Sequence, residues 1–117
     1  MAAAQFGLDH LIAFLDYNKM QIDGMIDEVM SLIDPCVKWE AFGFNAFRVD
    51  GHDVAVISDA IKQAKSAGNG KPSMIVLDTI KGKGVSFFEE AGPSCHFMPV
   101  SQETADNAYI ELDRSKQ

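Results

Sequence analysis

The run Leu11-Ile12-Ala13-Phe14-Leu15 decides how the fold is interpreted. It is short and apolar throughout, which is typical of a strand buried on both faces of a parallel sheet. Residues 74–77 (Met-Ile-Val-Leu) form another run of this kind, and residues 45–49 (Asn-Ala-Phe-Arg-Val) lie between the two in the sequence. The three runs therefore predict the strands of one parallel sheet.

Helical patterns separate these predicted strands. A helix is predicted after residues 21–24, with residues 37–42 as its later part and Gly43 as its end, and Pro35 marks either an entry or a break. Asp53 can cap a second helix, whose apolar positions recur at helical spacing: Val54, Ile57, Ile61 and Ala64. Strands that alternate with helices predict an α/β fold with right-handed crossovers. We expect a three-layer parallel sheet of about three strands with flanking helices, forming a single truncated domain over residues 1–117.

Three further segments carry weaker patterns. Residues 21–24 (Gln-Ile-Asp-Gly) are predicted to turn, because Asp-Gly tolerates positive φ angles. Residues 89–99 contain two prolines and a glycine with little periodicity, so we expect a loop there. Ser101 can open a final helix, whose expected buried stripe is Ala105, Ala108, Tyr109 and Leu112.

The acidic balance of the chain limits its partners. Lys and Arg number 10 against 17 Asp and Glu, which gives a formal net charge of −7 and an isoelectric point of about 4.7. Such a surface disfavours nucleic acid and anionic membrane as partners. The sequence has neither a signal-peptide pattern nor an apolar stretch of the ~20 residues that a membrane span needs. We therefore expect a cytoplasmic protein with Cys36 and Cys95 as free thiols.

Polar residues 16–20 (Asp-Tyr-Asn-Lys-Met) follow the first predicted strand. Ligands of parallel α/β sheets bind outside the carboxyl ends of the strands. The carbonyl oxygen of Asn18, a nearby backbone carbonyl and an acidic group are hard oxygen ligands, which suit Mg²⁺ or Ca²⁺ bound to a diphosphate. The alternative is a polar loop in which Asn18 caps its own backbone.

Two other segments offer chemistry. Residues 81–84 (Lys-Gly-Lys-Gly) form a glycine-rich basic loop that either cradles an anion with backbone N–H groups or is a flexible basic turn. His96 either performs acid–base or phosphate-binding work or is a surface histidine. Hydrolase arrangements are also open, as a triad of Ser86 or Ser94 with His96 and Glu89 or Glu90, or as carboxylate pairs such as Asp23 with Asp27 and Glu89 with Glu90.

Several motifs match one known family in order and spacing. They are residues 8–19 (LDHLIAFLDYNK) with 21–24 (QIDG), residues 38–44 (KWEAFGF), residues 49–53 (VDGHD), and residues 71–72 (KP) with 78–87 (DTIKGKGVSF). Together they resemble the second half of the thiamine-diphosphate-binding domain of transketolases. The form is closest to the amino-terminal subunit of split bacterial transketolases, and the match covers residues 1–96.

The resemblance implies roles for four residues. In that family thiamine diphosphate is held through a divalent metal, Mg²⁺ or Ca²⁺. Asn18 and the backbone carbonyl of Met20 match metal ligands, and Ile22 matches a residue that lines the cofactor. His96 matches a histidine near the diphosphate and the substrate, which makes it the candidate catalytic residue of a transferase.

The resemblance also implies what the sequence lacks. The Gly-Asp-Gly motif, whose Asp is a further metal ligand, and the pyrimidine-binding domain fall outside residues 1–117. We therefore expect a transketolase fragment or subunit part without independent transketolase activity. Loss of a neighbouring strand exposes a sheet edge, which predicts self-association or a complementary transketolase subunit. A hydrolase of another class on the same remnant fold and a non-catalytic interaction module stay open as alternatives.

Overall fold

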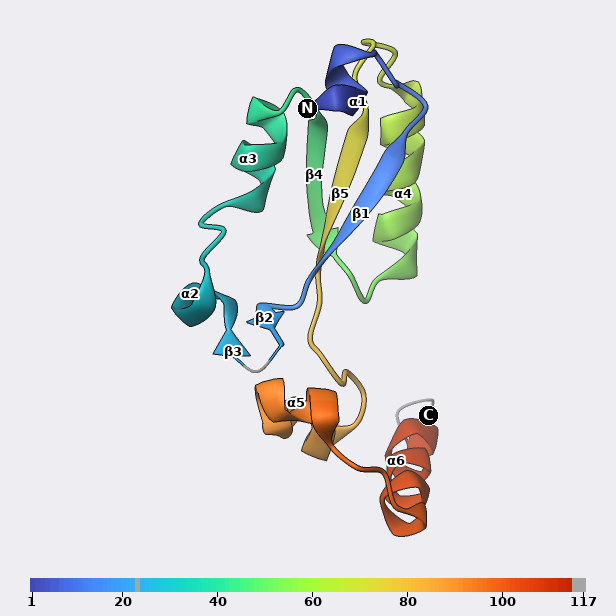
Figure 1. Ribbon diagram of the computed structural model, residues 1–117. Helices are drawn as coiled ribbons and strands as arrows, with labels where there is room; N and C mark the ends of the chain where they lie inside the picture. Colours follow the sequence, from blue (N-terminus) through green and yellow to red (C-terminus); the bar gives the residue numbers. More distant parts are fainter. Residues whose placement is uncertain (23, 115–117) are drawn as a thin grey trace. The chain divides into compact units, whose positions relative to one another are not determined.

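The computed structural model describes residues 1–22 and 24–114 (Figure 1). It divides into two compact units, which are considered separately below. The first unit contains Met1–Asn18 and Leu32–Thr79, and the second contains Lys19–Ser31 and the residues from Ile80 onward. The single domain expected over residues 1–117 stays a prediction.

The first unit is built on a three-stranded sheet, as predicted. Strands β1 (Ile12–Tyr17), β4 (Asn45–Asp50) and β5 (Ser73–Asp78) are all parallel and lie in the order β1-β5-β4. The central strand is the most deeply buried, with Ile75 and Val76 at 0% exposure. A strand with partners on both edges and helices on both faces requires such a continuous apolar run.

Two helices cover this sheet, one on each side (Figure 1). Helix α3 (Pro35–Ala41) begins with proline at its first turn, where a missing N–H costs nothing, and Gly43 follows it with φ +88°. Helix α4 (Val54–Ser66) is capped by Asp53, whose carboxylate accepts hydrogen bonds from two backbone N–H groups at 2.8 and 3.1 Å. A short helix, α1 (Ala2–Gln5), precedes β1. The predicted α/β class and three-layer arrangement are confirmed.

The second unit consists of short elements. Strands β2 (Met20–Gln21) and β3 (Gly24–Met25) form an antiparallel hairpin, followed by α2 (Ile26–Val29). Asp23, part of the predicted turn, lies outside the described residues. After the glycine-rich loop come α5 (Ser86–Ala91), the 3-10 helix η1 (Gly92–Phe97) and α6 (Gln102–Arg114).

The prediction of a loop over residues 89–99 is wrong. The segment continues α5 and then forms η1, in which Pro93 occupies the first turn. Proline is compatible with that position because its fixed φ matches the first residues of a helix. Gly92 has a φ angle of +56° and separates the two helices. This separation explains why the sequence of the segment shows little helical periodicity.

Helix α6 begins where the sequence predicts, because the Ser101 hydroxyl accepts a hydrogen bond from the Thr104 N–H at 3.1 Å. Its predicted buried stripe is only partly correct. Ala105, Ala108 and Leu112 are half-buried, but Tyr109 is 66% exposed. Within the described part of the chain, no helix combines the length and apolar character needed to cross a membrane.

Candidate functional site

The carboxyl ends of β1 and β5 are joined by side chains. The Thr79 hydroxyl, just after β5, donates a hydrogen bond to the Asp16 carboxylate in β1. The amide nitrogen of Asn18 donates to the other oxygen of the same carboxylate at 3.3 Å. The Asp16 carboxylate therefore positions the Asn18 side chain at the carboxyl end of the sheet by accepting a hydrogen bond from the Asn18 amide nitrogen. The Asn18 side-chain carbonyl oxygen is chemically a hard ligand of the kind that binds Mg²⁺ or Ca²⁺.

The second unit contains Met20 and Ile22 in an unusually shaped hairpin. Lys19 and Ile22 have positive φ angles of 65° and 55°. For a β-branched residue such as Ile22 this backbone conformation is a genuine outlier, and such strain is found at functional sites. The Ile22 side chain is 66% exposed, so burial of its own apolar surface does not compensate for the strain. A functional role for this hairpin stays a prediction.

His96 lies in η1, in the same unit as this hairpin. The His96 side chain is exposed, and its ring packs edge-on against Phe97 with 4.6 Å between the ring centroids. Strand β2, which holds Met20, lies beside η1. The structure thus brings the segments of Met20 and His96 together, whereas Asn18 is the last residue of the first unit's opening segment.

The glycine-rich loop contacts a carboxylate of its own chain. Gly82 and Gly84 have φ angles of +77° and +96°, which only glycine adopts readily. The Gly84 N–H donates to the Glu89 carboxylate at 2.9 Å, and the Lys83 ammonium lies 3.8 Å from the same oxygen. The loop therefore has the donor chemistry of an anion cradle, and Glu89 is the anion it holds here.

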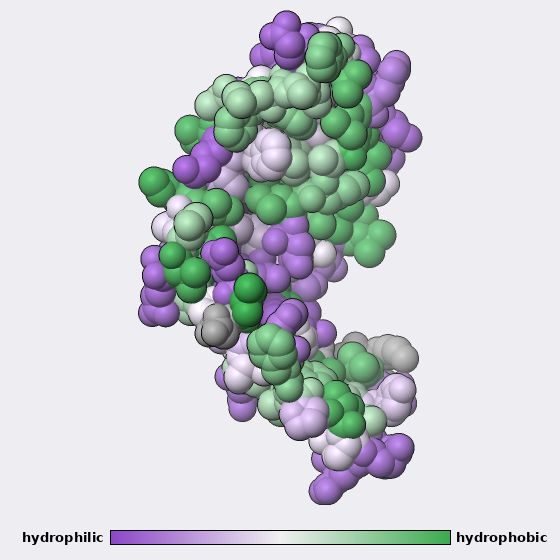
Figure 2. Space-filling view, in the orientation of Figure 1, coloured by the Kyte–Doolittle hydropathy of each residue, from purple (hydrophilic) through white to green (hydrophobic). Residues whose placement is uncertain are grey.

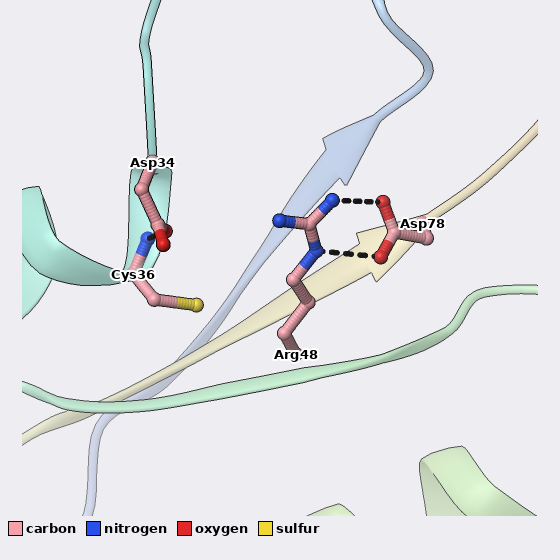
Figure 3. A network of polar contacts seen from close by, with 4 residues as sticks. All are labelled: Asp34, Cys36, Arg48 and Asp78. Carbon is pink, nitrogen blue, oxygen red and sulfur yellow. Dashed lines mark hydrogen bonds and ion pairs between the residues drawn. The ribbon is translucent and has the colours of Figure 1, made fainter.

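An ion pair that the sequence analysis missed lies on one face of the sheet (Figure 3). The Arg48 guanidinium donates two parallel hydrogen bonds to the Asp78 carboxylate, at 2.6 and 2.9 Å. The hydrogen bond to Asp78 is the main cause that raises the Arg48 pKa above its ordinary value. The Arg48 guanidinium also stacks over the Tyr17 ring, 5.4 Å from its centroid.

The sequence signal for this pair was a charged residue, Arg48, between the apolar residues Phe47 and Val49 of a predicted strand. The register explains the contact, because Arg48 lies opposite Val76 and therefore diagonal to Asp78 on the same face. Cys36 of α3 points toward the Arg48 side chain in Figure 3. Burial, followed by the nearby Asp34 carboxylate, raises the pKa of the Cys36 thiol.

The candidate serines of a Ser–His–acid triad bond to other groups. The Ser86 hydroxyl donates to the Glu111 carboxylate at 2.8 Å, and the Ser94 hydroxyl donates to the Ala91 carbonyl at 2.6 Å. The carboxylate pair of Asp23 with Asp27 cannot be assessed, because Asp23 lies outside the described residues. These contacts do not assemble a nucleophile and base over residues 1–22 and 24–114.

The oxygen donors fit only part of a metal site. Across the described residues, no group of three or more His, Cys, Asp or Glu side chains is arranged to hold a metal ion. Asn18 and the Met20 backbone supply two neutral carbonyl oxygens, whereas Mg²⁺ takes about six oxygen ligands. Such carbonyl oxygens have the chemistry that the predicted metal prefers, and the assignment of Asn18 and Met20 as its ligands stays a prediction.

Comparison with known protein families identifies the family of this chain. A family described as transketolase, thiamine diphosphate binding domain, matches residues 1–112. The chain belongs to the transketolase family. It is 50% identical over 107 residues to the 6-deoxy-6-sulfo-D-fructose transketolase subunit SqwG of Clostridium sp. (strain MSTE9), covering 92% of this chain and 38% of that subunit.

A second relative is one subunit of the apulose-4-phosphate transketolase of Phocaeicola vulgatus. Identity is 36% over 105 residues, covering 88% of this chain and 36% of that relative. The chain thus spans less than two fifths of the length of either relative.

Solved transketolase structures have the same fold as this chain. The enzyme from Campylobacter jejuni aligns with a TM-score of 0.79 and 27% identity, covering 96% of this chain and 17% of that one. A transketolase from Pichia stipitis aligns with a TM-score of 0.78 and 27% identity, covering 95% and 16%. The expected transketolase-type fold is therefore confirmed.

Proposed function

We propose that this chain is a component of a split transketolase that contributes part of a thiamine diphosphate site and works with a complementary subunit. The membership of residues 1–112 in the thiamine diphosphate binding family carries this proposal. Two similar proteins are described as transketolase subunits, which supports a complementary partner. The cytoplasm is the compartment we propose for it.

Four residues are proposed to contribute to the cofactor site. The Asn18 side-chain carbonyl and the Met20 backbone carbonyl are proposed to bind Mg²⁺ or Ca²⁺. Ile22 is proposed to line the thiamine diphosphate, and His96 is proposed to lie near the diphosphate of that cofactor. Support comes from the Asp16–Asn18 hydrogen bond at 3.3 Å and from the positive φ angles on either side of Met20. When bound, thiamine diphosphate supplies the carbanion chemistry of the reaction.

Two residues of this chain, Asp16 and His96, are proposed to assist cofactor binding and proton transfer. Asp16 orients Asn18 at the end of β1. The exposed His96 imidazole is proposed to hold a proton for a phosphate or hydroxyl oxygen, which a histidine can do near neutral pH. The chain alone is proposed to lack independent transketolase activity, because two neutral oxygens cannot complete a metal site.

Calorimetry with thiamine diphosphate and Mg²⁺ tests the cofactor proposal. The chain is titrated alone and after mixing with a complementary transketolase subunit, in each case with and without the metal. We expect Mg²⁺-dependent heat that is much larger in the mixture. Asn18→Ala should weaken binding by about tenfold or more, since it removes one oxygen ligand and leaves the others.

Asn107→Ala is the matched control, because Asn107 is an exposed asparagine on α6. It should bind the cofactor as the unchanged chain does. Absence of heat in every mixture would refute the cofactor proposal. Equal binding by the Asn18→Ala and Asn107→Ala proteins would refute the role of Asn18 alone. Ketose-transfer assays on the same mixtures test whether the chain is active without the complementary subunit.

A further inference from the structure

Three polar side chains come together on one face of the sheet at its carboxyl end. Asp16 pairs with Leu77 in the register of β1 and β5, so Thr79 lies diagonal to Asp16 on the same face. Asn18 follows Asp16 by two residues, the spacing that returns a side chain to the same face of a strand. Figure 2 shows hydrophilic side chains where Figure 1 draws the carboxyl ends of these strands. Asn18 and Thr79 therefore approach Asp16 from two neighbouring strands.

The Asp16 carboxylate has one oxygen for each of these partners. One oxygen accepts a hydrogen bond from the Thr79 hydroxyl, and the other accepts from the Asn18 amide nitrogen at 3.3 Å. An ionised carboxylate accepts hydrogen bonds and donates none, so only the nitrogen of the Asn18 amide can face it. The carbonyl oxygen on the other side of the same planar amide is thereby directed away from Asp16.

Packing against a neighbouring loop restricts the Thr79 side chain. Threonine is stiff about its first side-chain torsion, because two heavy atoms branch from its Cβ. The Thr79 methyl group lies against Gly51, where an added Cβ would overlap it. The Gly51 N–H donates to the Asp78 carbonyl at 2.8 Å, which holds the loop beside the end of β5. With the methyl group in this place, the Thr79 hydroxyl points to Asp16.

We propose that Thr79 is a positioning residue for the metal of the thiamine diphosphate site and acts on Asn18 through Asp16. The Thr79 hydroxyl fixes the Asp16 carboxylate, and the carboxylate fixes the orientation of the Asn18 amide. Oxygen, and not nitrogen, is then the amide atom directed away from Asp16, and oxygen is the atom that Mg²⁺ binds. This inference rests on the proposed function, in which Asn18 is a metal ligand.

Nuclear magnetic resonance of the chain without cofactor tests the orientation of the Asn18 amide. Asn18→Ala identifies the two side-chain amide protons of Asn18 by the loss of their signals. We expect these protons to exchange with solvent more slowly than those of Asn107, an exposed asparagine of α6. Thr79→Val keeps the branched shape and removes the hydroxyl, so it should speed the exchange at Asn18 by about threefold or more. Thr79→Ser keeps the hydroxyl and should preserve the slow exchange.

Calorimetry with thiamine diphosphate and Mg²⁺, in the mixture with the complementary subunit, tests the consequence for the metal. Thr79→Val should weaken the Mg²⁺-dependent binding by about tenfold, a loss typical of removing a group that orients a metal ligand. Thr79→Ser should bind as the unchanged chain does. In the Asn18→Ala background, Thr79→Val should cause no further loss, because Thr79 acts through Asn18.

Thr104→Val is the matched control for loss of a threonine hydroxyl. The Thr104 hydroxyl lies 2.8 Å from the Ser101 hydroxyl at the start of α6, and its removal should leave cofactor binding unchanged. Urea unfolding measures the stability of each variant. Thr79→Ala is a second, smaller variant without the hydroxyl, and it takes the place of Thr79→Val if that protein does not fold. The exchange of the Asn18 amide in the unchanged chain needs no variant.

Three results would overturn the proposal. They are equal exchange of the Asn18 and Asn107 amides in the unchanged chain, equal binding by Thr79→Val and Thr79→Ser, or an undiminished loss from Thr79→Val in the Asn18→Ala background. Each leaves the split transketolase standing when the unchanged mixture gives Mg²⁺-dependent heat. Absence of heat in every mixture would instead refute the proposed function, and the role of Thr79 in metal binding with it.

Discussion

Gly51 connects β4 to α4 at the carboxyl end of the sheet, and replacing it with alanine should destabilise the first unit. A Cβ built on Gly51 lies inside van der Waals contact with the Thr79 methyl group. It also lies 3.0 Å from the Asp78 carbonyl oxygen and 3.0 Å from the Leu77 Cβ. The last two atoms belong to the central strand, which cannot move without disturbing both of its neighbours. The Gly51 N–H also donates to the Asp78 carbonyl at 2.8 Å.

The magnitude follows from two terms. Forcing an extra carbon into a packed site costs about 1–3 kcal/mol. Thr79 can relieve its clash by turning away, but it then loses the hydrogen bond to Asp16, which is worth about 1 kcal/mol. The free energy of unfolding should therefore fall by about 2–4 kcal/mol, a large share of the ~5–15 kcal/mol typical of a domain.

Urea unfolding followed by circular dichroism measures this loss. The control is Thr79→Ser, which deletes the clashing methyl group and keeps the hydroxyl that bonds to Asp16. In the double variant, part of the loss from Gly51→Ala should be recovered, by about 1 kcal/mol. If Gly51→Ala unfolds at the same urea concentration as the unchanged chain, the steric reasoning is wrong. If Thr79→Ser recovers nothing, the clash with Thr79 is not its source.

Two further predictions concern polar groups. The Ser73 hydroxyl is fully buried and has no hydrogen-bond partner in the described part of the chain. Ser73→Ala should therefore leave the free energy of unfolding unchanged or raise it by up to about 1 kcal/mol. A clear fall in the free energy of unfolding, measured with urea, would contradict this. Hydrogen bonds from the Ser86 backbone, then from its hydroxyl, lower the Glu111 pKa. Their stabilisation is therefore present above the ordinary glutamate pKa of about 4.3 and is lost as pH falls through the lowered value. The protection of α6 amides against hydrogen exchange, relative to an unfolded chain at the same pH, should fall in that acid range in the unchanged chain, and an equal acid response in Glu111→Gln would refute the assignment.

The strands were predictable because their signal is local. An apolar run such as Ile75–Val76 indicates by its composition alone that it is buried, since a parallel strand covered on both faces has no polar side. Caps were equally readable, because Asp53 and Ser101 act on N–H groups two or three residues away. The expected strand over residues 11–15 is displaced by one residue at its start and two at its end, which is ordinary for element boundaries.

What failed depended on contacts distant in sequence. Arg48 and Asp78 are 30 residues apart, and only the parallel register makes them diagonal neighbours. Tyr109 was predicted to be buried on periodicity alone, but periodicity does not say which face of α6 has a partner. The segments of Met20 and His96 lie together through the packing of β2 beside η1, which no local pattern encodes.

The carboxyl end of the sheet gives a reason to include a metal in the proposed function. The strands end near three carboxylates, Asp16, Asp50 and Asp78, and each carboxylate accepts hydrogen bonds from groups of its own chain. Asp16 binds Thr79 and Asn18, Asp78 binds Arg48, and Asp50 accepts the His52 N–H at 2.8 Å. The Arg48 guanidinium is thus already matched by a carboxylate, so an incoming diphosphate at this edge would face uncompensated negative charge. A divalent cation, for which Asn18 is the proposed ligand, would offset that repulsion. The calorimetric heat should therefore disappear without Mg²⁺, and equal heat without metal would mean that the diphosphate binds away from this edge.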